Sequence, residues 1–414
     1  MAKLFTTSEW KKIFSELEGK EKEYGLPIRD DESLVLGSWN IRKFGEINPK
    51  KRDDNHFRFI SKAASHFDLL AVQEVMDDLG SVRRLRDELN ANISDPSKQY
   101  GLVLSDITGA MPGGEGMQER LAILYKRDRI RRTEVASDIS IDRGPVLKFL
   151  RGEVGKYVES LVDLIDDHEK SRKTLLKWAK EWAKKGKRKK TPKTPKLEFA
   201  SFLTFVRSPY CVSFQFGPSS SNPYEIMAVA AHLVFGTPEQ RKLEFNALMS
   251  WLSNRVVKKK RAYYQNFLLM GDLNLDIDTE KERIEVDNSI KDIAKNISSK
   301  GNNTDIYFPF ITPHPDNPDK ETFRSNARLT QTYDHIGFFT TDSRLPQAIN
   351  RHNPGVPGAL KDYGLFNFTD LFARAVYNKP FKEMKKGEAT KLIRRFEHTV
   401  SDHLPIWVRL EMPD

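Results

Sequence analysis

The stretch Phe267-Leu268-Leu269-Met270-Gly271-Asp272-Leu273-Asn274 decides the fold class, because an apolar run leads directly into a carboxylate and an amide. A short run of this kind, bounded by a glycine, is typical of a buried strand. Similar runs occur at 34–36, 68–72, 121–125, 225–231, 336–339 and 404–410, and helical patterns fall between them around 57–66, 80–90 and 238–258. This alternation predicts an α/β chain with buried strands.

Polar side chains stand at the ends of these runs. Four runs end in them and two begin with them, so they gather at one edge of the sheets if the latter two strands run antiparallel to the others. The set comprises Asn40, Glu74, His232, Asp272, Asn274, Asp334, Asp402 and His403. Oxygen donors without a thiolate favour Mg²⁺, with Mn²⁺ or Ca²⁺ as substitutes. Such a site suits the attack of water on a phosphorus centre.

The positive charge of the chain is concentrated in one segment. The 414 residues carry a net charge of +10, yet residues 169–196 alone contain 13 lysines or arginines against two glutamates, so the remainder is close to neutral. A basic block of this kind predicts a polyanionic partner, most often nucleic acid. A solvated charged excursion is the alternative that composition leaves open.

The basic block lies in a segment, 145–200, that interrupts the α/β rhythm. Its apolar residues form two helical stripes, one from Val146 to Ile165 and one from Leu175 to Trp182, which predict a helical hairpin followed by a basic tail. A capping-box pattern at Thr6 predicts a further helix over residues 6–24. We therefore expect a helical extension over 1–32 and one domain over 33–412 with an insertion at about 145–200.

Composition also predicts the cellular location of the protein. No apolar run reaches the roughly 18 residues that a membrane helix needs, and residues 1–7 turn polar before a signal-peptide core could form. A single cysteine, Cys211, excludes a disulfide scaffold and a clustered-cysteine zinc site. These features predict a cytoplasmic protein that does not associate with membranes.

The polar motifs resemble those of the endonuclease/exonuclease/phosphatase superfamily, and within it the deoxyribonuclease I branch. The similarity extends over residues 33–411 and consists of motifs in the same order. These are Ser38 to Glu46, Asp68 to Val75, Gln118-Glu119-Arg120, Arg207-Ser208-Pro209, Ala231-His232, Gly271 to Asn274, Thr332-Tyr333-Asp334 and Ser401-Asp402-His403. The resemblance implies a four-layer α/β sandwich, in which two mixed β-sheets pack face to face between flanking helices.

The resemblance also implies roles for individual residues. Glu74 would be the main Mg²⁺ ligand, with Asn40 and Asp402 beside it. Asp272 would orient water, and Asn274 and Arg207 would bind the phosphate. His232 would pair with Glu119, and His403 with Asp334, so that each imidazole can carry a proton. Substrate contacts are expected from Arg42 and Arg207 and from the basic residues Lys187, Arg188, Lys189 and Lys190.

The chain departs from the branch in two respects. Met76 and Met117 stand where the branch has an arginine and a tyrosine that enter the DNA minor groove, and the disulfides of the branch are absent. The function expected is hydrolysis of DNA to 5′-phosphate and 3′-hydroxyl ends, under the control of an unidentified regulator or inhibitor. Phosphoinositide, sphingomyelin or RNA substrates, and a non-catalytic binding module on the same fold, are the alternatives.

Overall fold

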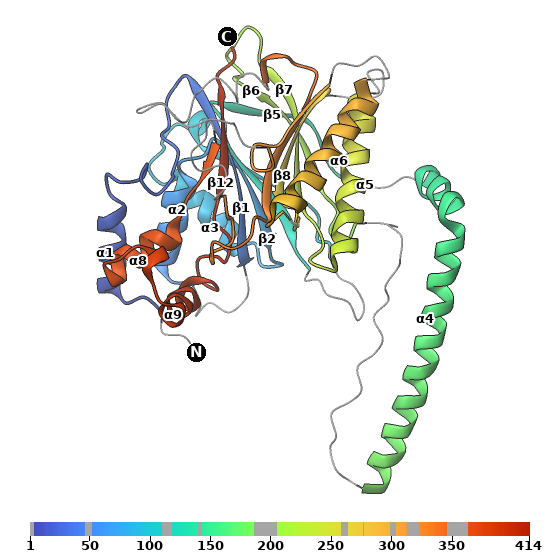
Figure 1. Cartoon of the computed structure of the whole chain (residues 1–414). Helices are drawn as coiled ribbons and strands as arrows, with labels where there is room; N and C mark the ends of the chain where they lie inside the picture. The colour runs from blue at the N-terminus through green and yellow to red at the C-terminus, as the bar shows by residue number, and fades with distance from the viewer. Residues whose placement is uncertain are drawn as a thin grey trace.

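The computed structural model describes residues 4–45, 52–109, 118–139, 143–185, 205–257, 264–275, 277–298, 304–312, 323–345 and 363–414. Two six-stranded sheets form the centre of the molecule (Figure 1). The strand order is β11-β12-β1-β2-β4-β3 in the first sheet and β5-β6-β7-β8-β10-β9 in the second. All seven strands predicted from the apolar runs are present, and the expected α/β sandwich is confirmed.

The first sheet is mixed. Its strands are β1 (Ser33–Phe44), β2 (Leu69–Val75), β3 (Tyr100–Leu104), β4 (Arg120–Lys126), β11 (Tyr363–Leu365) and β12 (Ile406–Glu411). Strand β1 runs parallel to β2 and antiparallel to β12. Because β12 enters the sheet from the end at which β1 finishes, the residues before β12 meet the last residues of β1.

The second sheet repeats this arrangement. Its strands are β5 (Ile130–Asp138), β6 (Tyr210–Phe216), β7 (Tyr224–His232), β8 (Asn266–Asp272), β9 (Asp305–Tyr307) and β10 (Asp334–Thr340). Strand β8 is parallel to β7 and antiparallel to β10. The two strands that begin with polar residues, β10 and β12, therefore run opposite to those that end with them, which is the condition under which the polar ends gather at one edge.

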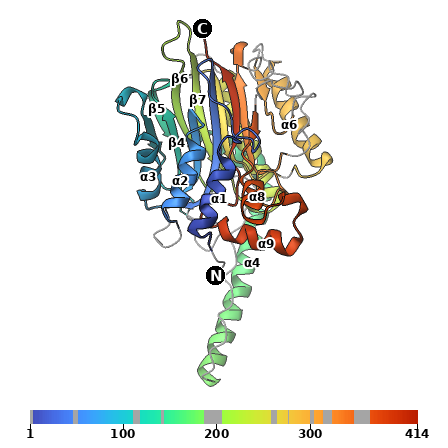
Figure 2. The same cartoon turned by 90° about the vertical axis from the view of Figure 1, so that its left-hand side faces the viewer.

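Three hydrophobic clusters separate four layers. One lies between the sheets and draws on both, for example Leu36, Ile123, Phe214 and Ile336. The helices that cover the first sheet are α1 (Thr7–Leu17), α2 (Asp54–Ala64), α3 (Gly80–Asn90), α8 (Phe368–Tyr377) and α9 (Lys386–Phe396), while α5 (Pro238–Val257) and α6 (Glu280–Ser298) cover the second. Figure 1 shows the sheets between these two groups of helices, and Figure 2, turned by 90°, faces the helices that cover the first sheet. Two short 3₁₀ turns, Pro96–Lys98 and Phe381–Glu383, complete the described elements.

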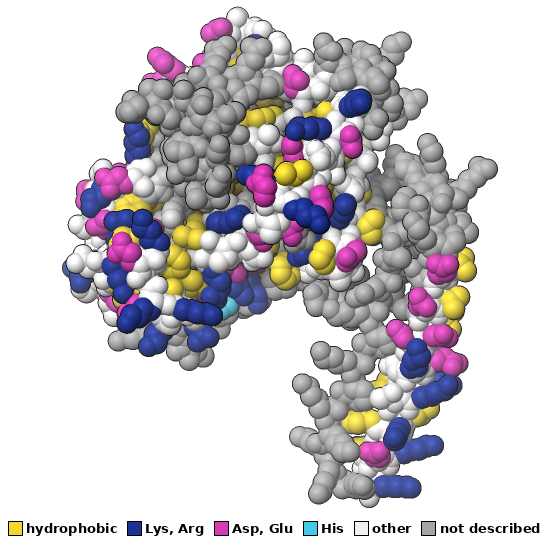
Figure 3. All heavy atoms as spheres, in the orientation of Figure 1, with side chains coloured by type: hydrophobic (Ala, Val, Ile, Leu, Met, Phe, Trp, Pro, Cys, Tyr) yellow, Lys and Arg dark blue, Asp and Glu magenta, His cyan; other side chains and the backbone are white. Residues whose placement is uncertain are grey.

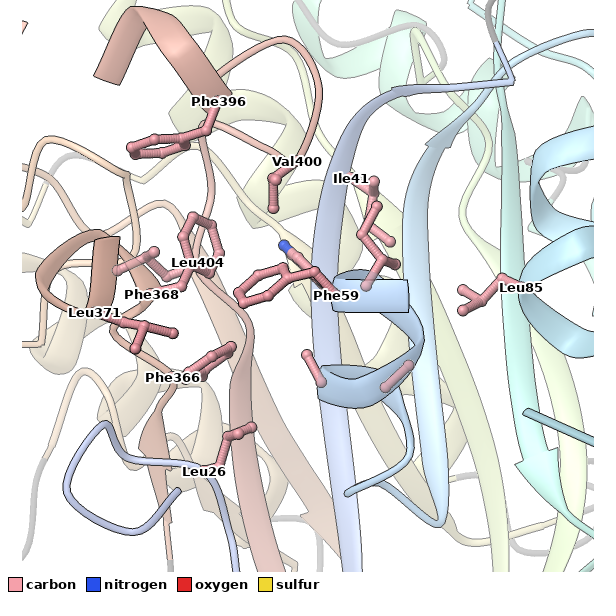
Figure 4. Packing of buried hydrophobic residues seen from close by; sticks show 14 of the residues in the cluster. Leu26, Ile41, Phe59, Leu85, Phe366, Phe368, Leu371, Phe396, Val400 and Leu404 are labelled. Atoms are coloured by element: carbon pink, nitrogen blue, oxygen red, sulfur yellow. The ribbon is translucent and has the colours of Figure 1, made fainter. Parts of the chain in front are cut away.

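Aromatic packing fixes the helices on the first sheet. Phe59 of α2 lies at the centre of this cluster, with its ring 5.9 Å from Phe366 and 6.0 Å from Phe368 (Figure 4). The N-terminal helix is shorter than predicted and ends at Leu17, but Trp10 and Ile13 are buried in the same cluster. This helix is thus packed on the body, although the division into two units at residue 32 stays a prediction.

The insertion differs from its prediction. Residues Arg143–Lys185 form one continuous helix, α4, rather than a hairpin. Both views show α4 projecting from the body (Figures 1 and 2). The sequence 166–174 between the two apolar stripes, Asp-Asp-His-Glu-Lys-Ser-Arg-Lys-Thr, contains neither glycine nor proline, so nothing in it breaks a helix. The hairpin prediction was wrong because the polar residues between the two stripes continue the helix instead of forming a turn.

Candidate active site

The strand register places the polar strand ends side by side. His232 at the end of β7 is paired in register with Asp272 at the end of β8, and Asp272 is paired with Asp334 at the start of β10. From the first sheet, β1 contributes Asn40 and β2 contributes Glu74. His403 lies just before β12. Six segments that are far apart in the sequence therefore supply one cluster at the same end of both sheets.

Each of the two histidines is paired with a carboxylate. The Nδ1 atom of His232 lies 2.6 Å from Oε1 of Glu119, and Nδ1 of His403 lies 2.8 Å from Oδ2 of Asp334. Both pairs are buried. A carboxylate on Nδ1 fixes the ring orientation and leaves Nε2 to face the site.

Asp272 lies between the two imidazoles. Its Oδ2 atom is 3.6 Å from Nε2 of His232 and 3.7 Å from Nε2 of His403, and it accepts a hydrogen bond of 3.0 Å from the Asn40 amide. The other oxygen, Oδ1, accepts a hydrogen bond of 3.1 Å from the backbone N–H of Asn274. The two histidines thus converge on one carboxylate oxygen, and a group bound there is within reach of both.

These contacts change the protonation behaviour of the cluster. Burial lowers the pKa of His403, but Asp334 and Asp272 outweigh it and the pKa lies well above the ordinary value. Burial and Arg207 lower the pKa of His232, and Glu119 with Asp272 again reverse the direction. Burial also raises the pKa of Asp272. Both imidazoles therefore keep a proton to higher pH than a free histidine does.

Asn40 and Glu74 face the same cluster from the first sheet. The Asn40 amide donates to Glu74 Oε1 at 3.2 Å, and the backbone N–H of Lys43 donates to Glu74 Oε2 at 2.9 Å. Glu74 has a positive φ of 58°, Lys43 of 47° and Asn274 of 48°, so three of the five described non-glycine residues with positive φ lie here. Backbone strain of this kind is concentrated at functional sites.

The donor set fits a hard divalent cation. Oδ1 of Asn40 and Oδ1 of Asp334 are buried and have no hydrogen-bond partner in the described part of the chain. Asp272, Asp334 and His403 also place one ligand atom each within 4.8 Å of one another. Carboxylate and amide oxygens with spare acceptor capacity are the ligands that Mg²⁺ and Mn²⁺ prefer.

Asn274 and Arg207, the residues expected to bind phosphate, are both buried behind Asp272 and Glu119. The Asn274 amide donates to the Leu233 carbonyl at 2.9 Å. Arg207 lies 3.0 Å from Glu119 Oε2 through its Nε atom, and its Nη1 donates to the same carbonyl at 3.3 Å. In this structure Arg207 therefore holds Glu119, and through it the orientation of His232.

The remaining predicted residues lie at the rim or outside the described chain. Arg42 and Asp402 form an ion pair of 2.6 Å, with about a third of each side chain exposed. The structure thus places Asp402 on Arg42 rather than on Asn40 or Glu74. The basic residues 187–190, and Met117, fall outside the described ranges.

Three buried residues that the sequence did not single out hold the site together. Ser401 donates to the Asn40 carbonyl at 2.6 Å and accepts from the His403 backbone N–H at 3.0 Å. It thus joins the end of β1 to the segment before β12. Ser325 accepts from the backbone N–H of Asp334 at 3.0 Å. Ser401 belongs to the motif Ser401-Asp402-His403 but received no role from the sequence, and Ser325 stands nine residues before Asp334 outside every motif, so only the fold identifies what these two serines do.

The third is Glu244 of α5. Its two oxygens accept from the backbone N–H groups of Val206 at 2.8 Å and Val234 at 2.7 Å, which fixes the chain next to Arg207 and just after His232. Burial raises the pKa of Glu244. One signal was available in the sequence, because Glu244 stands four residues before the buried Leu248, on the apolar face of the predicted helix 238–258.

An aromatic pair borders the site. The Tyr333 ring lies 5.8 Å from the His403 ring, and the Phe235 ring meets Tyr333 edge to face at 6.1 Å. Phe235 is 57% exposed, which is unusual for a large apolar side chain. The site therefore combines a buried polar cluster with an exposed aromatic surface beside it.

Comparisons with known proteins give remote likenesses of the fold. No protein-family model matches the chain, and no curated protein matches its sequence. The human Nocturnin catalytic domain superposes with a TM-score of 0.45 at 11% identity, covering 93% of this chain and 95% of that one. Truncated TDP2 from Caenorhabditis elegans gives 0.42 at 12% identity, covering 92% and 98%. An endonuclease/exonuclease/phosphatase family protein from Bacteroides thetaiotaomicron gives 0.39 at 15% identity, covering 92% and 98%.

At these identities and scores the likenesses carry no information about substrate or activity. The architecture itself rests on the strand order and layers described above. Within the described residues, no helix combines the length and apolar character that crossing a membrane requires. One of these solved structures is described as an endonuclease/exonuclease/phosphatase family protein, and the two mixed six-stranded sheets between helices agree with the sandwich that the sequence motifs implied.

Proposed function

We propose that the protein is a divalent-metal-dependent phosphodiesterase that hydrolyses DNA to 5′-phosphate and 3′-hydroxyl ends. One observation carries the proposal: two imidazoles, each backed by a buried carboxylate, converge on the same oxygen of Asp272. Hydrolysis of a phosphodiester needs a group that aligns or deprotonates water and a group that gives a proton to the leaving oxygen. This cluster offers both kinds of group around one carboxylate.

The geometry supports separate roles for Asp272 and for the two histidines. The oxygen of a water molecule aligned by Asp272 attacks phosphorus while the bond from phosphorus to the 3′ oxygen breaks. One histidine gives its proton to that leaving oxygen, and Asp272 takes up the proton that the water releases. The raised pKa values of His232 and His403 keep a proton available at neutral pH.

Glu74 and Asn40 are proposed to hold the cation, with Asp402 at the rim. A bound divalent cation would neutralise charge on the phosphate and on the leaving oxygen. The acidic excess of the site supports this assignment. Its five carboxylates face two guanidinium groups, those of Arg207 and Arg42. The carboxylates belong to Glu74, Glu119, Asp272, Asp334 and Asp402.

Three features favour DNA as the substrate. Phe235 offers an exposed ring beside the histidines, on which a nucleobase can stack. Arg42 lies at the rim, where it can meet a backbone phosphate. The second half of α4 carries lysines and extends beyond the end of the sheets at which β12 begins (Figure 1). A long polyanion bound at the site could reach it, whereas a small phosphate ester could not.

A phosphatase or phosphodiesterase acting on phosphoinositides, sphingomyelin or RNA is the competing proposal. The same polar cluster would serve each of these reactions. What distinguishes them is the surface around the site, where the described residues offer the exposed ring of Phe235 and the guanidinium group of Arg42.

Supercoiled plasmid, incubated with the full chain and Mg²⁺ with and without a chelator, tests the proposal. We expect nicked circles and then linear DNA, only without chelator, and ends that a DNA ligase reseals without prior phosphorylation. A panel of phosphomonoesters, inositol phosphates, sphingomyelin and RNA should turn over much more slowly. Turnover of one of these in preference to plasmid would transfer the assignment to that substrate, and chelator-resistant nicking would contradict the role of the metal.

A further inference from the structure

Helix α4 exposes apolar side chains along a large part of its length. Val158, Val162, Ile165, Leu176 and Trp182 are each between 51% and 61% exposed, and they include most of the strongly exposed large apolar residues described in the molecule. Figure 3 shows hydrophobic side chains at the surface of the part of α4 that projects from the body. An isolated helix with such a stripe is unstable in water, because the stripe needs a surface to pack against.

The stripe has the spacing of a coiled coil. Val158 and Ile165 stand seven residues apart, as do Leu175 and Trp182, and the two sets occupy the a and d positions of one heptad pattern. This pattern is symmetric about Lys170. Val158 and Trp182 are equally far from Lys170, and so are Ile165 and Leu175. If a second α4 lies antiparallel with the two-fold axis at Lys170, each a residue meets a d residue.

The charges of α4 are segregated about the same point. Between residues 158 and 169 the helix carries Glu159, Asp163, Asp166, Asp167 and Glu169 and no lysine or arginine. Between residues 170 and 185 it carries Lys170, Arg172, Lys173, Lys177, Lys180, Lys184 and Lys185 against Glu181. Figure 3 shows acidic side chains above and basic ones below along the arm. A parallel pair would bring like charges together, whereas an antiparallel pair brings acidic halves against basic halves.

We propose that α4 is a dimerisation arm that pairs with α4 of a second copy of this chain in the antiparallel direction. The apolar stripe provides the affinity, since burial of apolar area is the main driving force for association. The exposed charges contribute little to the affinity, because each exposed ion pair is weak by itself. Together they favour the antiparallel direction over the parallel one. The helical hairpin that the two stripes predicted within one chain is thus formed between two chains.

Other occupants fit the stripe less well. Residues 186–196, which follow α4 in the sequence, contain no apolar side chain except two prolines and so offer nothing to bury. An anionic membrane or a nucleic acid that covered the whole stripe would be repelled by its acidic half. The inference does not depend on the proposed nuclease activity, since the catalytic cluster uses no residue of α4.

Sedimentation equilibrium of the full chain from about 1 to 100 μM tests the association, since a dimer of this kind depends on concentration. We expect a reversible dimer. Ile165→Asp places a charge in the stripe and should weaken the dimer at least tenfold. The matched control is Thr174→Asp, which adds the same charge at an exposed polar position of the same helix and should leave the affinity within about twofold. Circular dichroism and plasmid nicking check that both variants are folded, because neither position touches the body or the site.

Disulfide cross-linking tests the direction. The sole cysteine of the chain, Cys211, is buried in the second sheet, so introduced cysteines report without interference. Val158→Cys protein mixed with Trp182→Cys protein should form a mixed disulfide dimer, and neither should cross-link with itself. Self-linked Val158→Cys dimers would show a parallel pair and overturn the proposal. A chain that is monomeric at 100 μM would overturn it as well.

Discussion

The two ends of strand β2 carry acidic residues in different surroundings. Asp68, immediately before the strand, is 1% exposed and lies 2.7 Å from Nη2 of Arg29 and 3.1 Å from Nε of Arg129, while it accepts a hydrogen bond from the Val35 backbone. Glu74, near the other end, has the amide of Asn40 and a backbone N–H as its described partners. The chain neutralises its own charge at one end and leaves an acidic excess at the other.

The difference shows how a structural charge can be told from a functional one. A buried carboxylate costs several kcal/mol in desolvation unless cations and donors compensate it. At Asp68 two arginines of the same chain provide this compensation. At Glu74 and Asp272 five carboxylates share two arginines, so compensation must come from outside the chain, from a cation or from protons on the histidines.

Replacing either histidine of the site should have the largest effect on activity. His232→Ala and His403→Ala should each lower turnover on plasmid about 10²–10⁴-fold, the usual effect of losing a positioned acid or base. His398→Ala, an exposed histidine outside the two carboxylate pairs, is the control. Nicking rates and melting temperatures should show loss of activity without loss of the fold. A His232 or His403 variant that nicks at the wild-type rate would remove that residue from the mechanism.

Glu74→Gln should reduce activity by weakening the binding of the cation. The amide keeps the shape of the side chain but loses the charge that attracts Mg²⁺, so raising the concentration of Mg²⁺ or Mn²⁺ should restore part of the rate. Glu225→Gln is the matched control, since Glu225 is exposed at the opposite end of β7 from His232. Activity measured against metal concentration should show a displaced midpoint for Glu74→Gln alone. An unchanged midpoint contradicts the ligand assignment.

At the other end of β2 the effect should be on stability rather than on catalysis. Asp68→Asn removes the buried carboxylate that Arg29 and Arg129 share and should lower the free energy of unfolding by roughly 3–5 kcal/mol. Asp87→Asn removes an exposed carboxylate, 63% accessible, from Arg86 and should change stability little. Denaturant titration gives both values. If Asp68→Asn abolished nicking by folded protein, the proposed division between the two ends would fail.

A histidine that faces away from the site should make the protein sensitive to acid. Burial lowers the pKa of His335 to about 4, from 6.5 in the unfolded chain. The unfolded state therefore binds a proton that the folded state refuses, so the stability present above pH 6.5 is lost as the pH falls to about 4, by roughly 3 kcal/mol. His335→Leu should flatten the dependence of unfolding free energy on pH in this window. If the unfolding free energy of His335→Leu depended on pH as steeply as that of the wild type, other groups would cause the loss of stability in acid.

The basic segment after α4 should have the smallest effect, confined to long DNA. If residues 187–190 contact phosphates, deleting them should raise the apparent KM for plasmid and lower the log–log salt slope by about 0.9 for each lost contact. Turnover on a short oligonucleotide at saturation should hardly change, because the catalytic cluster is built elsewhere. An unaltered salt slope for the deletion variant would favour a solvated excursion or a docking site for a protein regulator.

The predicted strands were found because buried strands are apolar along their whole length. The polar residues Asn40, Glu74 and Asp272 could be singled out because each ends such a run. The hydrogen bonds that hold these residues in place could not be predicted from the sequence. Glu244 and Ser325 accept hydrogen bonds from backbone N–H groups that are 9 to 38 residues away in the chain, outside their own helix or strand, and no local pattern encodes such a contact. The turn predicted within 145–200 was wrong although it concerned a local property. Residues 166–174 contain no glycine or proline, and the helix therefore continues through them.

The sequence by itself determined the alternation of strands and helices, the kinds of side chain at the strand ends, and the concentration of positive charge in one segment. These depend on composition and on periods of two or 3.6 residues, which are local properties. The tertiary structure alone decided that His232 and His403 face one oxygen of Asp272, that Arg207 serves Glu119, and that α4 leaves its apolar stripe exposed. Each of these depends on the register and packing of segments that are far apart in the chain, up to 171 residues for His232 and His403, which no local preference contains.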